Sequence, residues 1–264
     1  FGAFGREHDL AVGVQYSDTS FGYLGRQAPF TDPAWGPLPA LPDWTGEEVG
    51  RPAYGAAQVD ADFDYRMWRA YAATRLELTD RLSVIGGANY IDVESEGISY
   101  GVDFGRSESA LSPFAGVTFE AIDGVNLYAS YSDIFLPQHE TGTDYAPLGA
   151  AKGESMEIGL KAQTADGALL GTLALFRAEQ SNLAESAGLD PATGQTLYNG
   201  IDVVSEGVEF EITGRLAEGL LLQAGLTHLS LEDGNDGKVR TYVPRTTADI
   251  ALRWQPTTRL SLGA

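Results

Sequence analysis

The chain has 264 residues, a formal net charge of −20 at pH 7 and no cysteine. The lack of cysteine excludes disulfides and thiolate metal sites, and the negative charge argues against nucleic acid, whose phosphates would repel the protein. The longest apolar run, 167–176, is shorter than the roughly 18 residues of a membrane-spanning helix. Insertion into a membrane would therefore require a β-barrel.

Apolar residues that recur at every second position predict a series of long β-strands. From 6–17 to 259–264 we expect eleven strands, the longest at 60–78, 108–121, 201–216 and 240–254. In one of them Val208, Phe210 and Ile212 share one face, whereas Glu209 and Glu211 share the other. These runs exceed the roughly five or six residues of a usual globular strand and suffice to cross a bilayer.

Short turns alternate with longer polar connections along the chain. The turns are expected at 79–82, 122–125, 164–167, 216–219 and 255–258, and the longer connections at 18–57, 95–107, 136–153, 182–199 and 233–239. Transmembrane barrels place tight turns at one rim and long loops at the other, which a soluble sandwich has no reason to do. The pattern predicts an all-β fold, an antiparallel up-and-down transmembrane β-barrel segment.

Aromatic side chains near the strand ends agree with this prediction, because they suit the interfacial girdle of a barrel. They are Tyr16, Trp68, Tyr90, Phe119, Tyr131, Phe135 and Trp254. Bacterial single-chain barrels have even strand numbers, and residues 1–6 lack the basic and apolar regions of a signal peptide. We therefore expect the chain to be a fragment of a larger protein.

Several segments together carry a resemblance to a known family. They are Asn126–Gln138, a strand that runs into an outer loop, Gly153–Lys161, Leu173–Arg177 with Gln180–Ala184, Val204–Glu211, and the opening Phe4–His8. In order and spacing they resemble the barrel of TonB-dependent siderophore receptors of the ferripyoverdine and hydroxamate type. The resemblance implies that residues 1–264 form a single partial barrel domain, about half of a 22-stranded barrel without its plug.

The resemblance also implies a function. The family takes up ferric siderophores across the outer membrane of Gram-negative bacteria, and the TonB–ExbB–ExbD system drives uptake through the plug and its TonB box. The barrel contacts outer-membrane lipid. We expect no enzyme activity, no cofactor and no metal ligand, because the iron arrives already chelated by the siderophore.

Aromatic and cationic side chains of the outer loops are the candidate ligand contacts. They are Tyr23, Arg26, Trp35, Trp44, Arg51 and Tyr54 in 18–57, Tyr100 in 95–107 and Tyr145 in 136–153. Rings and cations suit a chelate with catecholate or hydroxamate arms, through stacking and charge attraction. The alternative for each residue is ordinary packing of the loops against the barrel rim.

The remaining sequence patterns do not predict a metal site. The acidic stretch 233–237 lacks the glycine and glutamate positions of a calcium loop, and we expect a plain hairpin loop. His8, His139 and His228 have no ligand spacing and are expected to be surface or wall residues. Two alternative functions remain, a passive porin-like outer-membrane barrel and a soluble β-sandwich binding module.

Overall fold

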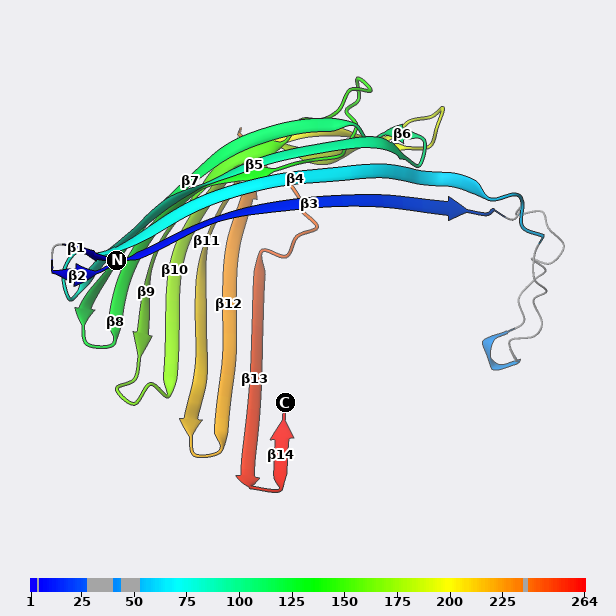
Figure 1. Cartoon of the computed structure of the whole chain (residues 1–264). Helices are drawn as coiled ribbons and strands as arrows, with labels where there is room; N and C mark the ends of the chain where they lie inside the picture. Colours follow the sequence, from blue (N-terminus) through cyan, green and yellow to red (C-terminus); the bar gives the residue numbers. More distant parts are fainter. Residues whose placement is uncertain (4, 28–39, 44–52, 235–236) are drawn as a thin grey trace. The chain divides into compact units, whose positions relative to one another are not determined.

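The computed structural model describes residues 1–3, 5–27, 40–43, 53–234 and 237–264. Its strands (Figure 1) are β1 (Gly2–Ala3), β2 (Arg6–Glu7), β3 (Asp9–Gly25), β4 (Gln58–Glu77), β5 (Leu82–Ser99), β6 (Val102–Asp103), β7 (Arg106–Ile122), β8 (Val125–Leu136), β9 (Ala151–Gln163), β10 (Leu169–Leu189), β11 (Thr196–Ala217), β12 (Leu220–Glu232), β13 (Thr246–Thr257) and β14 (Leu260–Gly263). A single 3₁₀ turn spans Leu41–Asp43. Within the described ranges, no helix is long and apolar enough to span a bilayer.

The long strands pair with their neighbours in chain order, from β3 at one edge to β14 at the other, and β6 pairs only with β5. Eleven strands of the described residues lie on this path, which confirms the predicted antiparallel up-and-down sheet. The only other sheet among these residues is the small β1–β2 hairpin. Among the described residues, no second sheet is therefore present to cover the first, as a β-sandwich would require.

Several strands reach further toward the long connections than the sequence predicts. The expected loop 182–199 is mostly strand, since β10 and β11 stay paired up to Leu189 and Thr196. Side chains beyond the bilayer face water on both sides, so hydrophobic alternation ends where the membrane ends rather than where pairing ends. By contrast, β13 starts later than the sequence predicts, at Thr246 rather than 240. Val243 N donates to Arg240 O in a turn that precedes Pro244, and this turn delays the start of the strand.

The described residues group into two compact units. The first consists of the described residues of 1–15, 68–92 and 108–264, and the second of those of 16–67 and 93–107. The single-domain organisation stays a prediction.

Strand register in the first unit separates an apolar face from a polar one. Cross-strand partners continue one apolar row through Phe119, Leu127, Leu160, Leu173, Phe210 and Leu226. An adjacent row on the opposite face contains Glu120, Asn126, Lys161, Thr172 and Glu211. Large apolar side chains are exposed, and buried apolar residues such as Ala151, Ala174 and Val203 are small.

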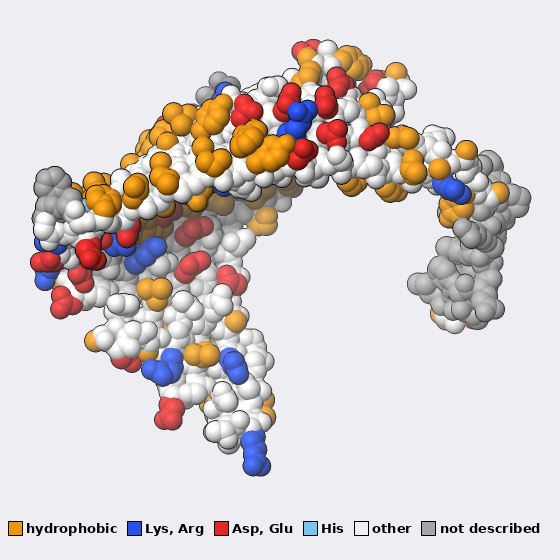
Figure 2. All heavy atoms as spheres, viewed as in Figure 1, with side chains coloured by type: hydrophobic (Ala, Val, Ile, Leu, Met, Phe, Trp, Pro, Cys, Tyr) orange, Lys and Arg blue, Asp and Glu red, His pale blue; other side chains and the backbone are white. Residues whose placement is uncertain are grey.

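Exposed apolar side chains are also evident over the strand surface in Figure 2, where Asp and Glu gather in patches of their own. Such extensive apolar exposure in water marks a surface that something else covers. The arrangement is inverted relative to a soluble protein, in which large apolar side chains form the core.

The turn between β9 and β10 shows how the short connections form. Gly167 has φ +65°, a conformation that glycine adopts without steric penalty. The Asp166 carboxylate accepts hydrogen bonds from Thr164 Oγ1 (2.6 Å) and Ala168 N (3.1 Å). These bonds, the threonine hydroxyl first, lower the pKa of Asp166. The Asp-Gly pair thus stabilises a tight hairpin.

Candidate functional site

The structure separates the eight predicted ligand contacts into three groups. Trp35, Trp44 and Arg51 lie outside the described residues. Tyr23, Arg26, Tyr54 and Tyr100 belong to the second unit, and Tyr145 belongs to the first.

Five rings of the second unit lie in two groups of ring contacts, Tyr23 with Tyr100 and Phe63 with both Phe21 and Phe104, which together we call the aromatic cluster. Tyr23 and Tyr100 have ring centroids 6.4 Å apart, tilted by 48°. Phe63 lies 5.1 Å from Phe21 and 4.1 Å from Phe104. Two of the predicted contacts, Tyr23 and Tyr100, are thus brought together from β3 and from the tip of the β5–β6 hairpin.

Sequence reasoning did not select Phe63 and Phe104 as members of this cluster. Phe63 lies between Asp62 and Asp64, an alternation that marks it as the apolar face of a strand but says nothing about its partners. Phe104 follows the two-residue strand β6, which is too short to leave a periodic signal. Cross-strand pairing, which is not readable from one segment, creates the cluster.

Backbone contacts hold the hairpin that carries Tyr100. Ser95, only 4% exposed, donates from its hydroxyl to the Phe104 carbonyl over 2.7 Å, and Phe104 N donates to Gly97 O over 2.9 Å. Tyr100 itself has φ +49°, an uncommon conformation for a bulky residue. Its side chain is 66% exposed, so the hairpin presents the ring rather than burying it.

The opposite face of β4 is charged. Arg66 lies three residues after Phe63 and therefore on the other side of the strand. Its guanidinium contacts Glu94 at 3.6 Å and Glu96 at 3.1 Å on β5. The second unit thus presents an aromatic face and a charged face.

Arg26 and Tyr54 lie at the two ends of the long connection after β3. Both are exposed, and Gly55 N donates to Gln27 O over 2.9 Å, which joins the two ends. The backbone therefore brings the positions of a predicted cation and a predicted aromatic ring toward each other at the base of this connection.

In the first unit, Tyr145 lies on the connection 137–150 between β8 and β9. Its φ is +64°, its side chain is 65% exposed, and its hydroxyl donates to Asp190 Oδ1 over 3.5 Å. Asp190 is buried and caps the β10–β11 turn by accepting from Thr193 Oγ1 (2.6 Å) and Ala192 N (3.0 Å). These hydrogen bonds, that of Thr193 first, lower the pKa of Asp190.

A buried glutamine fastens the connection 137–150 to β10. Gln138 is 5% exposed, and its Nε2 donates to the carbonyls of Gly149 (2.9 Å) and Asn182 (2.7 Å). Its Oε1 accepts from Ala184 N over 2.8 Å. Asn182, at φ +58°, adds a bond from its side-chain amide to Gly149 O over 2.7 Å. We call Gln138 and Asn182 the loop lock.

The tip of the same connection is held separately. Tyr198 N donates to Thr141 O over 3.0 Å, and Thr143 Oγ1 donates to Asn199 Oδ1 over 3.2 Å. Both ends and the tip of 137–150 are therefore attached to the β10–β11 hairpin. Tyr145 is displayed on an anchored segment.

The three histidines do not assemble. His8 is buried, and its Nδ1 accepts from Glu77 N over 3.1 Å, whereas His228 Nδ1 lies 2.7 Å from Thr246 Oγ1. Asp233 Oδ1 accepts from Gly237 N over 2.7 Å, as in a hairpin loop. In the part of the chain that the structure describes, no three His, Cys, Asp or Glu side chains are placed to hold a metal ion.

The sequence matches the family described as "TonB dependent receptor-like, beta-barrel" over residues 1–264. It is 32% identical over 259 residues to a ferric-pyoverdine BN7/BN8 receptor of Pseudomonas putida, covering 93% of this chain and 31% of that protein. It is 31% identical over 258 residues to a ferripyoverdine receptor of Pseudomonas aeruginosa, covering 93% of this chain and 30% of that protein.

A solved structure agrees with these sequence matches. The crystal structure of the outer-membrane ferripyoverdine receptor of Pseudomonas aeruginosa bound to ferripyoverdine superposes with a TM-score of 0.79 at 28% identity. The superposition covers 100% of this chain and 36% of that one. The chain thus spans about a third of the length of these relatives.

Proposed function

Because the chain belongs to the TonB-dependent receptor β-barrel family, we propose that it forms part of the barrel wall of a receptor that takes up ferric siderophores through the outer membrane. The family consists of receptors and transporters rather than enzymes, and its members lie in the outer membrane of Gram-negative bacteria. The observation that carries the proposal is the match to ferripyoverdine receptors along nearly the whole chain.

The two faces of the sheet support a membrane-spanning wall. The apolar row from Phe119 to Leu226 suits contact with lipid, and the opposite face, with Lys161 and Glu211, suits a watery interior. Within the first unit, the short turns after β9 and β11 lie at one end of the strands and the longer connection 137–150 lies at the other, which defines the orientation of the wall in the membrane.

The aromatic cluster and Tyr145 are the described residues that we assign to ligand contact. Tyr23 and Tyr100 offer exposed rings beside one another, and Phe21, Phe63 and Phe104 form a second group of ring contacts in the same unit. Rings of this kind stack on planar chelating groups. Arg26, Trp35, Trp44, Arg51 and Tyr54 stay predicted contacts from the same connection.

The energy for uptake comes from the TonB–ExbB–ExbD system. This system acts through a plug and a TonB box, which belong to the rest of such a receptor. The iron enters already chelated, so the wall needs neither a cofactor nor a metal ligand of its own. We expect no catalytic activity.

Uptake of iron-55 ferripyoverdine tests the proposal. The full-length gene that encodes this segment would be expressed in a Gram-negative strain that lacks its own siderophore receptors, with and without tonB. We expect accumulation of iron-55 that disappears without tonB, with ferrioxamine B as the comparison ligand. Accumulation of neither ligand would reject the siderophore proposal, and uptake that persists without tonB would favour the porin-like alternative.

A further inference from the structure

Ala184, near the outer end of β10, is hydrogen-bonded through both of its backbone groups to two connections that are far apart in the sequence. Its N–H donates to Gln138 Oε1 of the connection 137–150 over 2.8 Å. Its carbonyl accepts from Arg240 Nη2 over 2.7 Å, and Arg240 belongs to the connection between β12 and β13. All three residues lie in the first unit. A single residue of β10 thus joins two outer connections.

The pairing of β10 explains why side chains bond its backbone at this point. β9 pairs with β10 as far as Lys152 opposite Ser181, and the described residues show no pairing between these two strands beyond it. Backbone groups without a neighbouring strand need other hydrogen-bond partners. Gln138 and Arg240 supply these partners at Ala184, so the two side chains take the place of a strand.

A turn places Arg240 for this contact. Arg240 has φ +48°, a conformation that is uncommon outside glycine, and its carbonyl accepts from Val243 N over 2.9 Å. Its Nη1 donates to the Tyr242 hydroxyl over 3.3 Å, and its Nε is buried without a hydrogen-bond partner. A positive φ and an unsatisfied buried N–H both cost free energy, so other contacts must fix the residue. The bond to Ala184 O is the shortest that the guanidinium forms.

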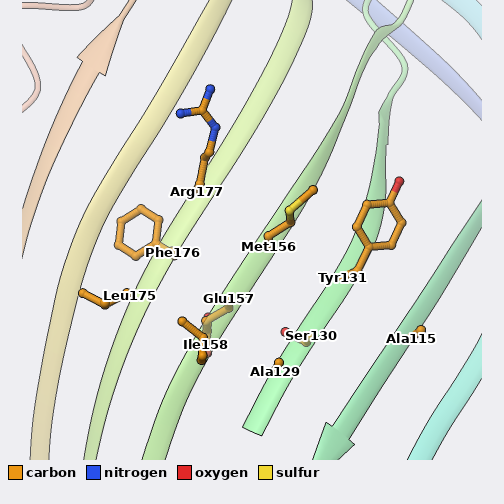
Figure 3. A pocket seen from close by; sticks show the side chains of 10 residues that line it. All are labelled: Ala115, Ala129, Ser130, Tyr131, Met156, Glu157, Ile158, Leu175, Phe176 and Arg177. Atoms are coloured by element: carbon orange, nitrogen blue, oxygen red, sulfur yellow. The ribbon is translucent and has the colours of Figure 1, made fainter.

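Arg240 is held by carbonyls, unlike the arginines that carboxylates hold. Arg177, which extends from β10 in Figure 3, forms ion pairs with Glu179 and Glu206. Within the described residues, Arg240 and Arg245 form no ion pair, and both donate to main-chain carbonyls. A hydrogen bond from a charged donor is roughly twice as strong as a neutral one, so Arg240 is firmly attached to β10.

Arg245, in the same connection, makes contacts of a different reach. Its Nη2 donates to Val239 O over 2.6 Å and to Leu231 O over 3.5 Å. Leu231 lies on β12 and Val239 lies in the connection itself. Arg245 therefore fastens the connection to its own strand, whereas Arg240 reaches β10, which is separated from β12 by β11 in the sheet.

We propose that Arg240 is a positioning residue that couples the connection 237–245 to the connection 137–150, so that the two open and close together. Opening of 237–245 withdraws the guanidinium from Ala184, and opening of 137–150 withdraws Gln138 from the same residue. Each event loosens the backbone to which the other connection is attached. Coupling between two sites is a free energy and acts equally in both directions. A ligand that orders one connection therefore also orders the other.

Hydrogen exchange of the full-length receptor in detergent, without siderophore, tests this coupling independently of the proposed function. The test variant is Arg240→Ala. The matched control is Arg245→Ala, which removes the same side chain from the same connection but loses no contact with β10. The reporters are the amides of Gly142 and Leu148, which form hydrogen bonds within 137–150.

We expect Arg240→Ala to speed exchange at Gly142 and Leu148 at least about fivefold, because a charged hydrogen bond is lost. Arg245→Ala is expected to leave both rates at the wild-type value. In the reverse direction, Gln138→Ala is expected to speed exchange at Val243, whose N–H donates to Arg240 O. Unchanged rates at Gly142 and Leu148 in Arg240→Ala, or an equal increase in Arg245→Ala, would overturn the proposal.

A double variant distinguishes coupling from two independent losses. Gln138→Ala combined with Arg240→Ala is expected to speed exchange by less than the product of the two single effects, because both side chains hold the same backbone segment. A multiplicative effect would contradict coupling. Heat-modifiable migration on gels verifies that each barrel is folded. If Arg240→Ala does not fold, the rate at Val243 in Gln138→Ala decides, and an unchanged rate there rejects the proposal.

Discussion

Tyr100 illustrates how a single residue is exposed for contact. The turn between β5 and β6 holds it at φ +49°, and its ring reaches Tyr23 while its side chain stays 66% exposed. A bulky residue at positive φ is uncommon, and such conformations concentrate at functional sites. The geometry therefore agrees with the ligand role that we propose for the aromatic cluster.

Substitution of Tyr100 measures that role directly. Tyr100→Ala is expected to weaken binding of ferripyoverdine by the full-length receptor about tenfold, since an aromatic contact contributes about 0.5–1.5 kcal/mol beyond its buried area. Tyr100→Phe keeps the ring and is expected to keep the affinity. Tyrosine fluorescence or calorimetric titration gives the dissociation constants, and Tyr90→Ala, on β5 outside the cluster, is the control. Unchanged affinity in Tyr100→Ala contradicts the assignment.

At position 159 on β9, the neighbouring atoms leave room only for glycine. A Cβ there would lie 2.6 Å from the Tyr128 ring and from Leu173 O. Tyr128 also donates to Glu157, so its ring cannot move without cost. The Tyr128 ring thus fills the space that a side chain at position 159 would otherwise occupy.

Gly159→Val is therefore expected to destabilise the barrel by about 1–3 kcal/mol through overpacking. Gly171→Val is the matched control, because a Cβ at Gly171 meets only Glu211 O at 3.8 Å. Denaturant unfolding in detergent, followed by tryptophan fluorescence, gives the two free energies. Similar losses in both variants would show that the contact with Tyr128 is unimportant.

Among the elements, the connection 137–150 is held by the loop lock at both of its ends. Gln138→Ala removes three hydrogen bonds from a buried site. We expect the local opening free energy of 137–150 to fall by about 2–4 kcal/mol, because each bond contributes about 0.5–1.5 kcal/mol. Hydrogen exchange of the full-length receptor measures this fall, and the exposed Gln223→Ala is the control. Unchanged protection would mean that the tip contacts suffice.

The β10–β11 turn is expected to weaken in acid. Hydrogen bonds lower the pKa of Asp190 in the folded protein, so the stabilisation is present above the unfolded carboxyl pKa of about 3.9 and is lost as pH falls through the lower folded value. Hydrogen exchange at Ala192, corrected for intrinsic rates, should show constant protection from neutral pH down to about 4 and loss below it. Asp190→Asn should flatten this dependence, and an equally steep loss in that variant would exclude Asp190 as its source.

At the scale of the whole molecule, the exposed apolar rows and the two end strands of the sheet, β3 and β14, decide how the isolated chain behaves. Unpaired strand edges template association with other chains. We expect the isolated chain to aggregate in water and to require detergent. Size-exclusion chromatography with circular dichroism checks this, and a monomer that melts sharply and reversibly without detergent would contradict it.

Residue patterns alone were sufficient to predict the antiparallel sheet, its chain-order pairing and the positions of four short turns; the fifth, expected at 255–258, lies between the end of β13 at Thr257 and the start of β14 at Leu260. Alternation and turn chemistry are local, so they survive in a single sequence. They failed at the outer ends of β3, β5, β10, β11 and β13, where side chains no longer distinguish lipid from water. The family resemblance supplied the receptor function, which the comparisons support.

Only the tertiary structure decided which residues meet. Gln138 and Asn182 are 44 positions apart, and Phe63 on β4 contacts Phe21 and Phe104, which come from other parts of the chain. Each of these depends on strand register, and a shift of one residue would send every side chain to the opposite face. The sequence by itself determined the two faces of the wall, whereas register determined what each face holds.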